Sequence, residues 1–391
     1  KFLTSSKLFL MFKEERTSVI KPLAIDSQEG TGSMGDDTAL AVLSKMHRQI
    51  YDFFRQQFAQ VTNPPIDSLR EAAVMTLETC YGPELNIYEE TPEHAKRLVT
   101  TSPVLSFRKL NSILHNPYFK SSEINLSFKE SSDLKSAIKK LQKDVEVKVR
   151  SGSSIIHLVE DLPKPGSLPI NALLAVGAVH SHLVRQQLRT FASVNVATGE
   201  CLDVHHFAVL IGVGATTVNP YGAEWAIEER KEKGLIEKLA LVDAVNNYKT
   251  AIETGLLKIM SKMGISVLSS YRGGYNFEAL GLSRSLVVDY FPSMSSRISG
   301  LGLNGIQTRV LEMHQRAFSN EVTYLPVGGQ FKYRKSGEAH AFDGQVIHAM
   351  QHACNTGSYD SWKKYVSMVS RQGPINLRDL LDFTPTKYIE I

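Results

Sequence analysis

Short apolar runs alternate with amphipathic stretches over the middle of the chain, from about residue 154 to residue 291. Five runs are rich in Val, Ile and Leu, as buried strands are; they lie at residues 155–159, 192–196, 216–218, 266–269 and 286–290. The stretches between them have the apolar spacing of helices and lie at residues 171–188, 207–214, 225–234 and 246–264. Because strands separated by helices need crossover connections, the pattern predicts an α/β fold of repeated βα units with a parallel sheet.

The flanking parts of the chain have different patterns. Residues 1–30 are expected to form a helix and a connector rich in Gly, Ser and Asp. Apolar residues at helical spacing predict a helix over about 41–61, which must stop before Asn63 because a proline follows it. A further helix is predicted over 68–79.

The pattern changes after Phe318, where a turn-rich, extended stretch leads to two predicted helices near 346–354 and 359–371. This change places a domain boundary near residue 320.

Parallel sheets bind ligands at the carboxyl ends of their strands, whether the sheet is an open doubly wound one or a closed barrel. The sequence leaves both arrangements open. The loops that follow the predicted strands are residues 197–206, 219–224, 270–276 and 291–300.

Two adjacent histidines, His205 and His206, follow one of these strands and precede a helix. With Asp203 and Glu200 close by, they could transfer protons or bind a metal. The alternative is a capped helix start with one buried and one exposed histidine. Cys201, in the same loop, has no other activating neighbour.

Arg272 is followed by Gly273 and Gly274, which allow the backbone to approach an anion or a neighbouring domain closely. With Arg297 in the next predicted βα loop, Arg272 could form an anion site. A structural salt bridge is the alternative.

Other candidate motifs are weaker. Asp36 and Asp37 could bind a metal, but without a third ligand nearby they are better explained by capping and turn formation. Residues 212–217 lack the glycine spacing of a dinucleotide site, and the sequence contains no P-loop.

Composition narrows the function classes. The 391 residues are 42% hydrophobic and 21% charged, which is typical of a globular protein. The net charge of +4 comes from scattered basic residues, so nucleic acid is not an expected partner. No run approaches the roughly 20 apolar residues of a membrane helix.

Three widely spaced cysteines, Cys80, Cys201 and Cys354, fit neither a disulfide framework nor a metal cluster. We therefore expect a cytoplasmic location. The absence of Met at position 1 and the abrupt ending after Ile391 lead us to expect that both ends are cuts.

Several strings, taken in order along the chain, strongly resemble the large subunit of glutamate synthases. They are GSMGDDTALAVLS, YDFFRQQFAQVTNPPIDSLREAAVM, TLETCYGPELN, LLAVGAVHSHLV, HHFAVLIGVGA, GLLKIMSKMGISVLSSYRGG and FKYRKSGEAHAF. The resemblance covers nearly the whole chain from about residue 12.

The resemblance implies a three-part division of the chain. Residues 1–30 would be a linker and helix from a preceding glutaminase domain. Residues 31–320 would be the barrel-related central domain, and residues 321–391 the truncated start of an FMN-binding (β/α)8 domain.

The resemblance also implies a reaction in which glutamine supplies ammonia to 2-oxoglutarate and FMN reduces the product, giving two glutamates. FMN and an iron-sulfur cluster would be the cofactors of the whole enzyme. Its partners would be the other domains of the same polypeptide and a small electron-donating subunit or ferredoxin.

No catalytic, cofactor or metal residue can be carried over from the family. The glutaminase nucleophile would be an N-terminal cysteine, whereas this chain begins with Lys1, and the three cysteines are too dispersed for the iron-sulfur cluster. Relatives often have a glutamate at the position of Ala197, so any role of that carboxylate is in doubt here.

The leading interpretation is therefore a glutamate synthase segment that links the glutaminase and FMN sites and is inactive alone. A stand-alone scaffold or binding remnant of that enzyme is the second. The third is an independent barrel-type enzyme that binds a small anion through Arg272 and Arg297.

Overall fold

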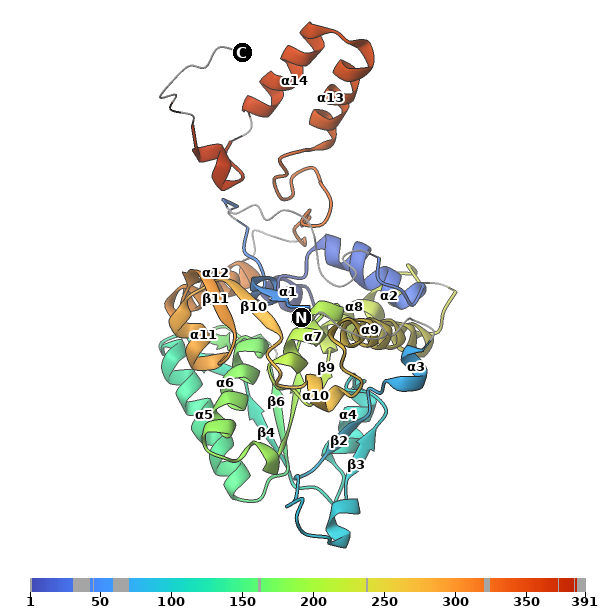
Figure 1. Cartoon of the computed structure of the whole chain (residues 1–391), viewed down its shortest axis with the longest axis vertical. Coiled ribbons are helices and arrows are strands. Elements are labelled where there is room, and N and C mark those ends of the chain that lie inside the picture. The colour runs from blue at the N-terminus through green and yellow to red at the C-terminus, as the bar shows by residue number, and fades with distance from the viewer. Residues whose placement is uncertain are drawn as a thin grey trace. The chain divides into compact units, whose positions relative to one another are not determined.

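The computed structural model describes residues 2–30, 43–44, 46–58, 70–160, 163–236, 238–319, 324–371, 373–382 and 384 (Figure 1). The chain divides into two compact units. The first comprises Lys1–Gly35 and Arg48–Leu325, and the second comprises Asp36–His47 and Pro326–Ile391. Asp36 and Asp37, considered above as metal ligands, lie outside the described residues.

A four-stranded parallel sheet forms the centre of the first unit. Its strands follow the order β4 (Ser121–Asn125), β6 (Ile155–Val159), β8 (Ser193–Ala197) and β9 (Thr217–Asn219). Val159 pairs with Ala197, and Ala197 pairs with Asn219, so these strands end level with one another. The predicted α/β class with a parallel sheet is confirmed.

Helices connect and cover these strands: α5 (Leu134–Arg150), α6 (Ala172–Arg185), α7 (Val204–Gly212), α8 (Tyr221–Glu232) and α9 (Leu241–Met263). Figure 1 shows α5 and α6 lying side by side along the sheet. Helix α6 is buried over most of its length because β8, α5 and α7 all contact it. Helix α9 ends at Gly264, whose φ of 69° forms a left-handed C-cap. The helices predicted between the strands are thus confirmed.

A second ladder joins distant parts of the first unit. Strand β10 (Phe277–Leu282) pairs antiparallel with β1 (Phe54–Gln56) and parallel with β11 (Ser295–Leu301). Around it lie α10 (Leu268–Tyr271), α11 (Arg284–Tyr290) and α12 (Leu303–Phe318).

Shorter elements complete the first unit. Strand β2 (Thr79–Tyr81) pairs with β3 (Leu98–Thr100), and β5 (Ser127–Lys129) pairs with β7 (Ser167–Pro169). The short helices are α3 (Glu71–Val74), α4 (Phe107–Leu114), and the 3₁₀ turns η2 (Ile50–Phe53), η3 (Pro92–Ala95) and η4 (Arg189–Phe191).

The first residues of the chain pack onto this unit. Helix α1 (Phe2–Leu8) contacts α12, while the π-helical turn η1 (Glu15–Ile20) and helix α2 (Lys21–Ile25) contact α8 and α9 respectively. Arg16 forms an ion pair with Glu229 of α8. None of the helices in the described residues combines the length and apolar character needed to cross a bilayer.

The helix predicted over 41–61 is wrong where the structure describes it. The chain makes a single 3₁₀ turn at η2 and then enters β1. Phe54 is fully buried and packs edge-on against Phe291 at 5.1 Å between ring centroids. A distant apolar contact and the pairing with β10 therefore outweigh the local helical spacing.

Three further expectations are corrected. The helix predicted over 68–79 is reduced to α3, and Thr79 already begins β2. The strand predicted at 266–269 is replaced by the short helix α10. The run 286–290 is helix α11, because Ser283 caps it by accepting a hydrogen bond from Leu286 N.

The second unit contains α13 (Gly344–Thr356) and α14 (Tyr359–Arg371), two helices that pack against each other. Both were predicted and are confirmed. Asp343 caps α13 by accepting hydrogen bonds from Gln345 N and Val346 N, and Gly357 ends it with φ of 62°. The unit also has the 3₁₀ turn η5 (Leu377–Leu380).

Two glycines bring the loop after β8 against the start of α8. A Cβ on Gly222 would lie 2.4 Å from the carbonyl oxygen of Gly199, and a Cβ on Gly199 would lie 2.6 Å from the Phe9 ring. The first of these contacts is with backbone, which cannot move aside without shifting the loop.

We expect Gly222→Ala to lower the free energy of unfolding by about 1–3 kcal/mol, because the new methyl group overpacks a backbone contact. Denaturant titration measures this. Gly302→Ala is the matched control, since its Cβ would meet nothing closer than 3.4 Å, and we expect it to cost less than about 1 kcal/mol. Equal losses in the two variants would contradict the close contact.

Candidate functional site

The carboxyl ends of β6, β8 and β9 bring polar side chains together. Glu160 directly follows β6, Thr198 and Glu200 follow β8, and Tyr221 begins α8 just after β9. Since parallel strands expose this edge to their connecting loops, it is where α/β proteins place their ligands. We treat these residues as the candidate site.

Glu160 connects all three strand ends. Its Oε1 accepts a hydrogen bond from Thr198 Oγ1 at 2.8 Å, and its Oε2 accepts from Gly199 N at 2.7 Å and from the Tyr221 hydroxyl at 2.9 Å. The residue is only 5% exposed. Both carboxyl oxygens are therefore used within the protein.

The side chain of Glu200, in the loop after β8, lies against the start of α6. Its Oε1 accepts a hydrogen bond from Asn171 Nδ2 at 2.9 Å, and its Oε2 accepts from Ala172 N at 3.1 Å. The amide of Ala172 is one of the helix N-terminal donors that lack a partner within the helix. Glu200 supplies that partner.

Burial governs the protonation of both carboxyl groups. Loss of hydration raises the pKa of Glu160 to about 7, although its hydrogen-bond donors oppose the shift. Loss of hydration, and secondarily the negative charge of Glu160, raises the pKa of Glu200 to about 8. Below about pH 7 the two acids therefore hold protons that an exposed pair would release.

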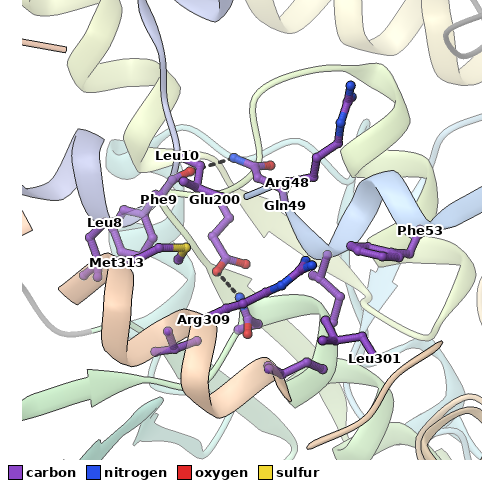
Figure 2. Close-up of a pocket in the computed structure, with 14 residues that line it drawn as sticks. Leu8, Phe9, Leu10, Arg48, Gln49, Phe53, Glu200, Leu301, Arg309 and Met313 are labelled. Carbon is purple, nitrogen blue, oxygen red and sulfur yellow. Dashed lines mark hydrogen bonds between the residues drawn. The ribbon is translucent and has the colours of Figure 1, made fainter. Parts of the chain in front are cut away.

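A small cavity of about 30 Å³ lies beside Glu200 (Figure 2). Figure 2 shows Glu200 between the segment Leu8–Leu10 and Arg309 of α12. Gln49 holds the segment in place by donating from Nε2 to the carbonyl oxygen of Phe9 at 2.7 Å. The cavity has about the volume of one water molecule.

The two predicted histidines are held by the same part of the fold. Asp203 caps α7 by accepting from His206 N at 2.9 Å, and His206 Nδ1 accepts from Leu202 N at 3.1 Å. Because Nδ1 is an acceptor, it carries no proton, and its approach of 3.7 Å to Asp203 is not an ion pair.

His205 and His206 also position Tyr51. His205 Nε2 lies 3.1 Å from the carbonyl oxygen of Tyr51, and the His206 ring lies 4.5 Å from the Tyr51 ring. Burial lowers the pKa of His205, so it donates as a neutral imidazole. The Tyr51 hydroxyl is buried without a hydrogen-bond partner among the described residues.

The described residues do not offer a metal centre, since no three His, Cys, Asp or Glu side chains come together as potential ligands. Cys201 is buried beside Glu200, and burial raises the pKa of its thiol.

Arg272 and Arg297, considered together as an anion site, each lie beside a different acidic residue. Arg272 follows α10, and its Nη2 lies 3.5 Å from Glu84 Oε1. Arg297 lies in the middle of β11, where its Nε is 3.3 Å from Glu278 Oε1 and its side chain is 78% exposed. Its expected position in a loop after a strand at 286–290 is wrong, because that run is helix α11.

The two glycines after Arg272 serve close packing. Gly273 has φ of 71°, and its N donates to the carbonyl oxygen of Ile211 at 3.1 Å. A Cβ on Gly273 would lie 2.9 Å from the ring of His180, while one on Gly274 would lie 3.0 Å from Asn276 Nδ2. His180 in turn accepts from Nε of the half-buried Arg189 at 3.0 Å.

The family description of the glutamate synthase central domain matches residues 4–283. The chain belongs to this family. Its resemblance to glutamate synthases is thereby confirmed over most of its length.

Curated relatives agree with this assignment. The chain is 49% identical to the glutamate synthase [NADPH] large chain of Azospirillum brasilense over 382 residues, which are 97% of this chain and 25% of the relative. It is 37% identical to the glutamate synthase [NADPH] large chain of Bacillus subtilis, with the same coverage of both chains. The ferredoxin-dependent glutamate synthase 2 of Arabidopsis thaliana is also 37% identical, over 95% of this chain and 24% of the relative. This glutamate synthase segment therefore spans about a quarter of the relatives it matches.

Sequence analysis of this glutamate synthase segment did not single out Glu160, Tyr221 or Tyr51. A usable signal existed for Glu160, which is an acid directly after a predicted buried strand. Tyr221 lies in the predicted strand-end loop 219–224, but its hydrogen bond to Glu160 could be found only in the fold, as could the approach of the orphaned Tyr51 hydroxyl.

The raised carboxyl pKa values predict a stability that falls with pH. In the unfolded chain these acids ionise near pH 4.5, whereas in the folded chain they stay protonated up to about pH 7 and pH 8. The folded state therefore binds more protons over this interval, so stability decreases as pH rises from about 4.5 to 8 and then levels off.

We expect Glu200→Gln to reduce this pH-dependent loss by on the order of 3 kcal/mol, because the neutral amide removes one buried titration. Urea unfolding at pH values from 5 to 9 measures it. Glu130→Gln, an exposed change in the loop before α5, should leave the slope as it is in the parent chain. An unchanged pH dependence of stability in Glu200→Gln would contradict the raised pKa of the Glu200 carboxyl group.

Proposed function

We propose that this chain is the central part of a glutamate synthase large chain, where it links the glutaminase and FMN sites and has no catalytic activity alone. The family membership and the matching quarter of much longer relatives support this placement. The fold then acts as a scaffold that fixes the separation of two reacting centres.

The closure of the sheet's carboxyl edge is the observation that carries the proposal. Every carboxyl oxygen of Glu160 and Glu200 accepts a hydrogen bond from the chain itself, and Phe9 covers Gly199. The cavity of about 30 Å³ beside Glu200 is far below the 300–1,000 Å³ or so of ligand sites. This edge is therefore used for internal packing rather than for a substrate.

The proposal retains the division made from the sequence. Residues 1–30 lead in from the glutaminase part, residues 31–320 are the central domain, and residues 321–391 begin the FMN-binding part. The whole enzyme would make two glutamates from glutamine and 2-oxoglutarate in the cytoplasm. It would use FMN, an iron-sulfur cluster and electrons from a small subunit or ferredoxin.

The anion-binding alternative has less support. Arg272 and Arg297 each lie beside a different carboxylate, Glu84 and Glu278 respectively. His205, His206, Gly273 and Gly274 remain candidates for contacts with other domains of the same polypeptide.

We expect the purified 391-residue chain to be colourless and to release no ammonia from glutamine, because its own strand ends are closed. Absorbance between 350 and 500 nm and an ammonia assay at roughly millimolar glutamine measure the two properties. Stoichiometric flavin, or steady ammonia release from clean protein, would overturn the inactive-scaffold reading.

The linking role itself is tested in the full-length large chain. We expect Phe9→Leu to loosen the cover over Gly199 and to lower the glutamate formed per glutamine hydrolysed, while glutamine hydrolysis continues. Both rates are measured on the same preparation. Phe107→Leu, at a 61% exposed position, is the control and should keep the parent ratio.

A Phe9→Leu enzyme that loses thermal stability but keeps the parent ratio would show that this packing serves folding alone. The linking proposal would then fail for this edge of the sheet.

A further inference from the structure

A second cavity, of about 420 Å³, lies on the first unit where the β5–β7 ladder meets α5. Its lining comes from β4, β5, the loop before α5, α5 itself and β7, and consists of Ile124, Asn125, Ser127, Phe128, Lys129, Ser132, Ser136, Ala137, Lys140, Leu141, Asp144, Ser167 and Ile170. None of these residues belongs to the carboxyl cluster described above. The volume falls within the range of small-molecule sites.

The floor of this cavity is apolar and fixed. Ile124, Phe128, Leu141 and Ile170 are each no more than 8% exposed. Strand pairing holds Phe128 opposite Leu168, and Ile170 N donates to the carbonyl oxygen of Leu126 at 2.8 Å. Rigid elements thus preform the floor, and a ligand body resting on it would lose water contact without rearranging the chain.

The rim carries unused hydrogen-bonding groups. Among the described residues, no hydrogen bond involves the side chains of Asn125, Ser127, Ser132, Ser167 or Lys129. The acidic group of the lining, Asp144, already accepts from Lys140 Nζ at 2.6 Å. The open groups are therefore three hydroxyls, one amide and one ammonium, which donate readily to an oxyanion.

The lining carries more positive than negative charge, because it holds Lys129 and Lys140 but only one acidic residue, Asp144. Helix α5 carries six basic and two acidic side chains along Leu134–Arg150. Lys129 on β5 and Lys140 on α5 face the cavity from two different elements. A ligand with a negative end is thus attracted to the rim, while its apolar part fits the floor.

We propose that this cavity binds a small organic anion, with a phosphate or carboxylate group at the Lys129 rim and a compact apolar body on the Phe128–Leu141 floor. This site is separate from the linking role and does not depend on it. The chain would thereby carry a ligand site outside the carboxyl edge of its sheet.

Phenyl phosphate and benzoate are suitable probes, because they share an aromatic body and differ in the oxyanion. Calorimetric titration of the full chain should give saturable 1:1 binding of at least one of them. We expect Lys129→Ala to weaken that binding about tenfold, through loss of a charge-assisted hydrogen bond. The stronger of the two probes identifies which oxyanion the rim prefers.

A second variant and a control locate the binding. Ala137→Phe should abolish it by filling the cavity, whereas Lys143→Ala, a change on α5 outside the lining, should leave it within about twofold. The bound probe should also protect Lys129 from acetylation more than Lys143, as measured by mass spectrometry. Circular dichroism of each variant establishes that it is folded.

Three results would overturn the proposal. The first is that neither probe gives saturable binding. The second is that inorganic phosphate binds as tightly as phenyl phosphate, because exposed charge alone would then attract anions. The third is binding by folded Ala137→Phe with the affinity of the parent chain.

Discussion

The arrangement of the first unit depends on the hydrogen bonds that the buried carboxyl group of Glu160 accepts. Thr198, Gly199 and Tyr221 converge on it from the ends of two neighbouring strands. A buried carboxyl group is costly unless hydrogen bonds compensate it, so the three donors must keep their positions. This requirement fixes the positions of the loop after β8 and of the start of α8. It thereby fixes the surface against which Phe9 packs.

The N-terminal segment converts this fixed edge into a packed interface. Phe9 lies over Gly199 and packs edge-on against Tyr221 at 6.4 Å between ring centroids. In an α/β enzyme the corresponding edge stays open for a substrate, whereas here the chain's own residues occupy it. This packing of the edge by the chain's own residues fits the scaffold role proposed above.

The sequence predicted the parallel sheet because β6, β8 and β9 are short apolar runs between clear helical stretches. It failed where a local pattern competed with distant contacts. Phe54 fits a helical spacing, but its burial against Phe291 and its pairing with β10 place it in a strand. The run 286–290 is too short for periodicity to separate strand from helix, and the cap at Ser283 decides it. The site was predicted only in its location, since the partners of Glu160 and Glu200 come from loops distant in sequence.

The contact between Gly199 and Gly222 has a consequence for the gene. Every missense change in either codon adds a Cβ, at position 222 against backbone atoms and at position 199 against an aromatic ring. Neither position can accept the smallest of these changes until its neighbour has moved, and for position 222 that neighbour is the Gly199 backbone, which the carboxyl group of Glu160 holds in place. We therefore expect these two codons to drift almost entirely by synonymous change, while surface positions of the same helix vary freely.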